Sequence, residues 1–280
     1  MKDRAFAKIN LCLDVVRKRE DGYHDLRMVM VPIDFYDVLE MNFAEETTLE
    51  LNRSYLPVND KNTVIKAIRV MQETYGFDQE FECKLTKHIP TQAGLAGGSA
   101  DAAAAIRIMN RMMHLNMSDE EMIDVAKQVG ADVPFCTINK PALVEGIGEK
   151  IQPFECYDIE FGILLVKPRR GVSTKRAFGA LDYDRLEHPD CDAMVKALTN
   201  NSYIDVVDNL GNSIERASLK LVRDIREVKQ DLVAYGFDGV LMSGSGSTVF
   251  GLTQNQRLLN QAADLMKRKG YFVRVTKMKK

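Results

Sequence analysis

Residues 90–105 read PTQAGLAGGSADAAAA and place three glycines directly ahead of a run of alanines. Gly94, Gly97 and Gly98 allow the backbone to adopt positive φ or to approach a ligand closely. Ser99 is predicted to be the N-cap of a helix that the alanines continue. The first amides of such a helix have no partner in the chain, and with the helix dipole they favour a bound anion. The stretch therefore predicts a phosphate-binding loop, although a tight turn before a closely packed helix explains the glycines equally well.

Two common phosphate-binding patterns are absent. The chain contains no G-x-x-x-x-G-K-[ST] and no G-x-G-x-x-G sequence. The first absence excludes the usual P-loop, and the second disfavours a dinucleotide-binding oxidoreductase.

Composition indicates an ordinary globular protein. The chain has 280 residues, 45% hydrophobic and 28% charged, which suggests one large or two ordinary domains. Its 38 lysines and arginines nearly balance 40 aspartates and glutamates, so neither nucleic acid nor an anionic membrane is expected as a partner. Five dispersed cysteines without a C-x-x-C pair predict reduced thiols. No signal-like segment or bilayer-length apolar run is visible, so we expect a cytoplasmic location.

Hydrophobic periodicity predicts an α+β protein in two parts. Alternation over residues 5–16 indicates a strand whose mixed face carries Lys8 and Asn10. Helical spacing predicts one helix over residues 213–235, and residues 239–252 are predicted to form a strand. The expected domains are residues 1–160 and 161–280.

Further along the chain, helix signals are explicit. The segment 62–76 keeps a helical apolar stripe and closes on Gly76, and Ser118 with Glu121 forms a capping box. The alanine-rich helix is expected from Ser99 to about His114.

The glycine and alanine stretch resembles the signature loop of the GHMP kinases. Other segments are similar to the 4-diphosphocytidyl-2-C-methyl-D-erythritol kinases, namely AKINLCLDVVRKREDGYHDL, GADVPF and EGIGEKI. These motifs occupy family-like positions from residue 5 to about 152, and MSGSGSTVF at 242–250 resembles the family's third motif. Residues 175–235 match little of the family pattern.

The resemblance implies a fold and a reaction. The fold would have an N-terminal domain like ribosomal protein S5 domain 2 and a ferredoxin-like C-terminal domain, with the active site between them. The reaction would be ATP-dependent phosphorylation of the 2-hydroxyl of 4-diphosphocytidyl-2-C-methyl-D-erythritol, in non-mevalonate isoprenoid precursor biosynthesis. The substrate would be a small molecule, and the enzyme a monomer or homodimer.

The resemblance also assigns the ATP site to the glycine-rich stretch. The residues expected to bind ATP are Pro90, Thr91, Gln92, Ala93, Gly94, Leu95, Ala96, Gly97, Gly98, Ser99 and Ala100. Ser99 would reach a phosphate or Mg²⁺ through its hydroxyl. Some relatives carry a second serine and an asparagine where this chain has Ala100 and Asp101, which puts a hydroxyl role at position 100 in doubt. Asp101 would either favour the metal or cap the helix.

Two polar residues match the family's catalytic positions, and a third lies beside one of them. Asp132 matches the catalytic aspartate and would act as the base that a hydroxyl acceptor needs. Lys8 matches the motif-one lysine and would steady the developing charge on the attacking oxygen. Asn10 shares its strand face and would bind substrate or Asp132. Without the resemblance, Asp132 reads as a turn residue and Lys8 as a surface lysine on an edge strand.

The second substrate site rests on the DGYH segment. The resemblance implies that Tyr23 stacks on the cytosine ring and that His24 hydrogen-bonds its edge. Phe178 would supply the other side of the sandwich, although a lone phenylalanine at helical spacing is more often a core residue. Residues Gly244, Ser245 and Gly246 would approach the transferring phosphate or the substrate diphosphate through their amides, although a flexible hairpin over residues 243–248 explains this composition at least as well.

Two alternatives stay open. The chain could be a GHMP kinase for another small alcohol, of mevalonate or homoserine type, which would leave Tyr23 and His24 without a base to hold. It could also be a nucleotide-binding homologue that has lost catalysis. Asp132→Ala separates the two cases, because in an active enzyme this substitution should abolish catalysis and leave ATP binding intact.

Overall fold

The computed structural model describes residues 1–156 and 159–279. The strands are β1 (Lys2–Lys18), β2 (His24–Ala44), β3 (Thr48–Leu51), β4 (Glu80–Thr86), β5 (Ala142–Gly146), β6 (Lys150–Pro153), β7 (Gly162–Lys167), β8 (Gly211–Asn212), β9 (Gly239–Met242), β10 (Val249–Thr253) and β11 (Phe272–Thr276). The helices are α1 (Thr63–Tyr75), α2 (Gly97–Met112), α3 (Asp119–Val129), α4 (Val133–Ile138), α5 (Thr174–Gly179), α6 (Cys191–Thr199), α7 (Tyr203–Asp208), α8 (Glu215–Leu221), α9 (Arg223–Tyr235) and α10 (Gln256–Arg268), with a 3₁₀ turn η1 (Tyr183–Arg185).

The chain forms two compact units that alternate along the sequence. The first contains Met1–Ala7, Phe35–Thr91 and Ala96–Lys140, and the second contains Lys8–Asp34, Gln92–Leu95 and Pro141–Lys280. The alternation arises because β1 and β2 each contribute residues to both units. The domain division at residues 160 and 161 stays a prediction.

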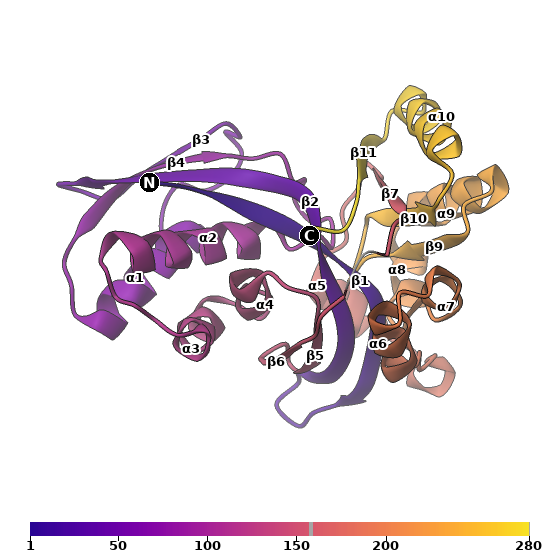
Figure 1. Ribbon diagram of the computed structural model, residues 1–280, viewed down its shortest axis with the longest axis horizontal. Helices are drawn as coiled ribbons and strands as arrows, with labels where there is room; N and C mark the ends of the chain where they lie inside the picture. Colours follow the sequence, from indigo (N-terminus) through magenta and orange to yellow (C-terminus); the bar gives the residue numbers. More distant parts are fainter. Residues whose placement is uncertain (157–158, 280) are drawn as a thin grey trace. The chain divides into compact units, whose positions relative to one another are not determined.

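The first unit places helices on a sheet. Within it, β4 pairs antiparallel with the Val38–Ala44 part of β2 and parallel with β3. Helices α1 to α4 gather on one side of these strands (Figure 1). The alanines at 102–105 in α2 are fully buried, and their small side chains let α2 pack closely against α1 and α4.

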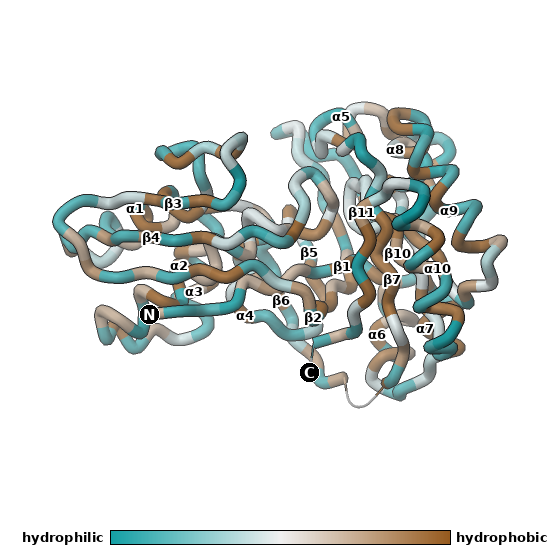
Figure 2. The backbone as a smooth tube through the Cα atoms, turned by 90° about the horizontal axis from the view of Figure 1, so that it is seen from above, coloured by the Kyte–Doolittle hydropathy of each residue, from teal (hydrophilic) through white to brown (hydrophobic). Residues whose placement is uncertain are grey.

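The second unit contains a four-stranded antiparallel sheet in the order β11-β7-β10-β9. Helices α9 and α10 pack against its strands. The order and the β7-α9-β9-β10-α10-β11 succession are those of a ferredoxin-like domain, as predicted. Figure 2 shows the apolar character of β7 and β10, whose residues are almost all buried. The same unit holds the β2–β5, β5–β6 and β1–β8 pairings.

Several elements predicted from short sequence patterns are confirmed. The predicted strand over residues 5–16 lies within β1, and α1 closes on Gly76 with a φ of 66°. The capping box between Ser118 and Glu121 is present at the start of α3. Among the described residues, no helix has the length and apolar character to cross a bilayer.

Two predictions for the second half are wrong. The helix over residues 213–235 is two helices, α8 and α9, because Val222 takes an extended conformation with φ −135°. The strand over residues 239–252 is two antiparallel strands, β9 and β10, joined by a glycine-rich turn at Ser243–Thr248. The break at Val222 leaves the helical apolar spacing intact, so periodicity could not detect it, whereas the second break falls in SGSGST, which has no apolar residue.

Candidate active site

The glycine loop, residues 90–96, enters α2 through left-handed backbone. Gly94 has a φ of 73°, and Ala96, the N-cap of α2, has a φ of 56°. The amides of residues 97–99 have no acceptor among the described residues, as expected at a helix start without a side-chain cap. The predicted Ser99 cap is wrong, because the N-cap is the left-handed Ala96, three residues earlier. Ser99 therefore keeps both its amide and its hydroxyl free of partners in the described chain.

Space, as well as φ, requires glycine in this loop. A Cβ at Gly94 would lie 2.0 Å from the carbonyl oxygen of Ser243, and one at Gly97 would lie 2.9 Å from Cγ2 of Ile89. Both distances are shorter than any ordinary contact between unbonded atoms. At Gly98 the nearest atom would be 3.5 Å away, so only the first two positions exclude a side chain.

A buried cluster of charges lies next to the glycine loop in the first unit. Lys87 donates hydrogen bonds from Nζ to Asp37 and to Oδ2 of Asp101, the latter at 2.5 Å. Asp37 also accepts the amides of His88 and Ile89 through Oδ1. These three residues are at most 4% exposed. Sequence reasoning missed Lys87 and Asp37, because no local pattern marks them.

The protonation of this cluster follows from burial and hydrogen bonding. Burial raises the pKa of Asp101 to about 8, although the ammonium of Lys87 opposes the shift. Burial lowers the pKa of Lys87, but the two aspartates outweigh it, so the lysine stays charged. The Oδ1 atom of Asp101 is buried without a partner among the described residues. Asp101 therefore does not cap α2, as one prediction had it, but is buried and bonded to Lys87.

Lys8 and Asn10 form a second buried polar group, on β1 in the second unit. Lys8 is 4% exposed and donates from Nζ to Oδ1 of Asn10 at 2.6 Å, and it has no carboxylate partner in the described chain. The alternative of a surface lysine is wrong. A Cβ at Gly244 would lie 3.4 Å from Nζ of Lys8, so this glycine lets the turn after β9 approach the ammonium closely. A buried lysine without a carboxylate partner is costly, so Lys8 belongs to a candidate functional site.

The turn after β9 is hydrogen-bonded to part of the glycine loop. Ser243 donates from Oγ to the carbonyl of Gly94 at 2.9 Å and accepts the amide of Asn10 at 3.4 Å. The amide of Thr248 donates to the carbonyl of Ala93 at 3.2 Å. Ser243 thus links the strand that carries Lys8 with the loop that carries Gly94.

Side chains from three further elements support the turn that carries Gly244 and Ser245. Asn212 donates from Nδ2 to the carbonyl of Gly244 at 2.8 Å. Ser218 of α8 donates to the carbonyl of Ser245 at 2.9 Å, and Thr174 of α5 lies 3.0 Å from the Ser245 hydroxyl. The carbonyl oxygens of Gly244 and Ser245 therefore both accept hydrogen bonds from the protein.

Asp132 occupies the N-cap position of α4 in the first unit. Its carboxylate is half-buried and makes no hydrogen bond or ion pair within residues 1–156 and 159–279. A carboxylate without a protein partner is free to accept a proton from a bound hydroxyl.

Three rings meet in the second unit around His24. The His24 and Phe178 rings lie 4.7 Å apart, and the hydroxyl of Tyr183 is 2.7 Å from Nε2 of His24. Burial, followed by the nearby Lys18, lowers the pKa of His24 and keeps the imidazole neutral at pH 7. Tyr23 is 62% exposed. Sequence reasoning missed Tyr183, whose ring lies on η1 in the segment that matched no family motif.

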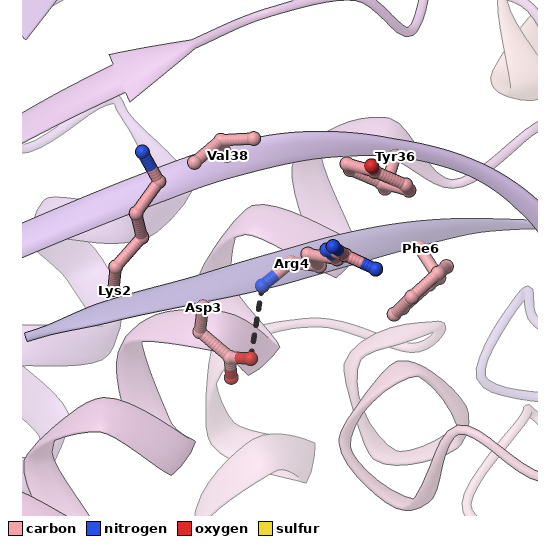
Figure 3. A pocket seen from close by; sticks show the side chains of 6 residues that line it. All are labelled: Lys2, Asp3, Arg4, Phe6, Tyr36 and Val38. Carbon is pink, nitrogen blue, oxygen red and sulfur yellow. Dashed lines mark hydrogen bonds between the residues drawn. The ribbon is translucent and has the colours of Figure 1, made fainter.

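Two hollows lie away from the predicted site residues. One of about 650 Å³ opens on the first unit, where side chains of β1 and β2 surround it (Figure 3). Its lining residues are Lys2, Asp3, Arg4, Phe6, Tyr36 and Val38. Another, of about 810 Å³, lies in the second unit near β7 and β11. Neither contains a residue predicted for the site.

Comparison with known proteins shows the family of the chain. A model of the GHMP kinases N terminal domain matches residues 62–140, and a model of the GHMP kinases C terminal region matches residues 193–271. A 4-diphosphocytidyl-2-C-methyl-D-erythritol kinase from Clostridium beijerinckii is 42% identical over 279 residues, 99% of each chain. The chain belongs to the GHMP kinase family. A relative of the same name from Exiguobacterium sibiricum is 40% identical over 92% of each chain.

Solved structures agree with this membership. A crystal structure of 4-(cytidine 5'-diphospho)-2C-methyl-D-erythritol kinase superposes with a TM-score of 0.82 at 29% identity over the whole of both chains. A homoserine kinase from Cytophaga hutchinsonii, 19% identical, shares the fold with a TM-score of 0.73 over 98% and 94% of the two chains. The predicted two-domain GHMP kinase fold is therefore confirmed, and membership of a kinase family implies that the chain uses ATP.

Proposed function

We propose that the chain transfers the γ-phosphoryl group of ATP to the 2-hydroxyl of 4-diphosphocytidyl-2-C-methyl-D-erythritol, giving the 2-phosphate and ADP. The observation that carries this proposal is the 42% identity, over nearly the full length, with a kinase of that name. The ring cluster at His24 supports a substrate with a nucleobase. A role in non-mevalonate isoprenoid precursor biosynthesis, a cytoplasmic location and a monomeric or homodimeric state belong to the same proposal.

The ATP phosphates would bind at the start of α2. The amides of residues 97–99 have no partner in the described part of the chain, and they lie at the N-terminus of α2, where the helix dipole favours a bound anion. The free hydroxyl of Ser99 fits a role as ligand to Mg²⁺, which supplies charge neutralisation on the phosphates when bound. Among the described residues, no group of three His, Cys, Asp or Glu side chains is placed to hold a metal. Ser99 and phosphate oxygens would therefore share the ion, as is usual for Mg²⁺.

Lys8 and Asp132 would act on the alcohol. The free carboxylate of Asp132 accepts the hydroxyl proton as the oxygen attacks the γ-phosphorus. The ammonium of Lys8, which has no carboxylate partner, stabilises the negative charge that develops on that oxygen. Asn10 accepts one N–H of Lys8 and so orients the other two.

The cytidine diphosphate part would bind in the second unit. Tyr23 is exposed and free to stack on a pyrimidine, with Phe178 as the second ring. The neutral His24 would hydrogen-bond the base edge, for which the Tyr183 hydroxyl must give way. In the turn at Gly244, Ser245 and Gly246, the first two residues would offer amides to the diphosphate, because the Gly246 amide already donates to the carbonyl of Ser243 at 2.9 Å.

One assay tests the acceptor. ADP release is measured with purified protein and ATP, offering the cytidine diphosphate substrate, a mevalonate-type alcohol and homoserine separately. We expect turnover with the first. Turnover with another alcohol alone would reject the acceptor while keeping the kinase family, and no turnover with any would favour an inactive homologue.

A further inference from the structure

The buried cluster of Lys87, Asp37 and Asp101 has no part in the phosphoryl transfer described above. Each residue is at most 4% exposed, and all three belong to the first unit. Buried ion pairs are often no more stable than well-packed apolar residues, because desolvation offsets the attraction between the charges. Fold stability alone therefore does not explain why three ionisable side chains are buried together here.

The cluster connects both ends of the glycine loop. Where the loop begins, Asp37 accepts the amides of His88 and Ile89 and so ties the chain after β4 to β2. Where the loop has ended, Asp101 is the fifth residue of α2 and accepts a hydrogen bond from Lys87. Lys87 bonds both aspartates, so a single ammonium joins the entry and the exit of the loop.

The ammonium also lies against the first residue of α2. A Cβ at Gly97 would be 3.4 Å from Nζ of Lys87, which places the charge beside the peptide that presents the amides of residues 97–99. Lys87 is 4% exposed and its Nζ is hydrogen-bonded to both aspartates, so its influence on a ligand would pass through the adjacent backbone. The helices α1, α3 and α4 also pack against α2. All residues of these three helices are described, and none of their buried residues is charged.

We propose that Lys87 is a positioning residue for the nucleotide: held by Asp37 and Asp101, its ammonium fixes the amides of residues 97–99 in the geometry that a polyphosphate requires. Preorganised donors bind more tightly because they need no ordering when the ligand arrives. The inference rests on the proposed function only for the identity of the nucleotide. Adenosine lacks phosphates, so its affinity does not depend on Lys87.

Nucleotide binding without any alcohol substrate tests this role. Calorimetric titrations with ATP, ADP and adenosine compare the wild type with Lys87→Met and with Lys87→Met/Asp101→Leu. We expect both variants to lose about tenfold or more in affinity for ATP and ADP, the scale of one displaced charge-assisted hydrogen bond. Adenosine affinity is expected to stay unchanged. Lys127→Met, which removes an exposed pair with Asp124, is the matched control and binds all three ligands normally.

The double variant separates positioning from stability. Lys87→Met alone leaves two carboxylates buried without a cation and can fail to fold, whereas the double variant leaves only Asp37, which keeps its two backbone amides. We expect a urea midpoint near that of the wild type. A folded double variant with wild-type ATP affinity, equal losses for ATP and adenosine, or an unfolded double variant would each overturn the inference. Failure of the wild type itself to bind ATP would instead refute the proposed function.

Discussion

Gly94→Ala measures how tightly the glycine loop fits against the turn at Ser243–Thr248. The substitution adds one methyl group at a backbone with a φ of 73°. An alanine held in this left-handed region loses about 1 kcal/mol relative to glycine. The new Cβ would also lie 2.0 Å from the carbonyl oxygen of Ser243, so one segment must move.

That movement breaks hydrogen bonds between the two segments. The bonds at risk join Ser243 to the Gly94 carbonyl and Thr248 to the Ala93 carbonyl. Each hydrogen bond contributes about 0.5–1.5 kcal/mol. Together with the backbone cost, we expect Gly94→Ala to lower the free energy of unfolding by about 2–4 kcal/mol.

Urea unfolding at constant m value provides the measurement. Gly76→Ala is the matched control, because Gly76 has a similar φ of 66° with no atom within 4 Å of its added Cβ. The control should lose only the backbone cost of about 1 kcal/mol. If Gly94→Ala loses no more than Gly76→Ala, the close approach of loop and turn does not exist in solution and the reasoning is refuted.

Three further substitutions address the chemistry and the electrostatics. Asp132→Asn should lower kcat by roughly 10²–10⁴-fold while ATP affinity is kept, and a variant with near-normal kcat would remove Asp132 from the role of base. Tyr23→Ala should raise KM for the cytidine diphosphate substrate by roughly 5–150-fold, the worth of one stacked base, and leave KM for ATP unchanged; an equal rise in both would argue against stacking. Glu80 has a lowered pKa because Thr47 donates a hydrogen bond to it and Arg69 forms an ion pair at 2.9 Å. Since the folded-state pKa is below the unfolded one, this stabilisation is present at neutral pH and is lost as pH falls below about 4.5. Glu80→Gln should therefore reduce stability by about 0.5–1 kcal/mol at pH 7 and by less at pH 3, as urea midpoints at both values will reveal.

Local signals in the sequence predicted the elements around the site. The glycines at 94 and 97 marked a close-approach loop, and the alanines at 102–105 marked the helix behind it. The Ser99 cap failed because a left-handed Ala96 is not favoured by its own sequence and is imposed by the surrounding chain. The motif residues Lys8 and Asp132 could be named from the sequence, and their roles stay predictions.

What sequence by itself determined was therefore whatever depends on neighbours a few residues apart: caps, turns, alternating faces and the family motifs. Tertiary structure alone decided the partners of the buried charges, since Asp37, Lys87 and Asp101 come from a strand, a loop and a helix. It also brought Tyr183 to His24 across 159 positions. The physical reason is burial: desolvation compels a charge or a polar ring edge to find a partner, and chain folding, rather than spacing in the sequence, determines which partner lies within reach.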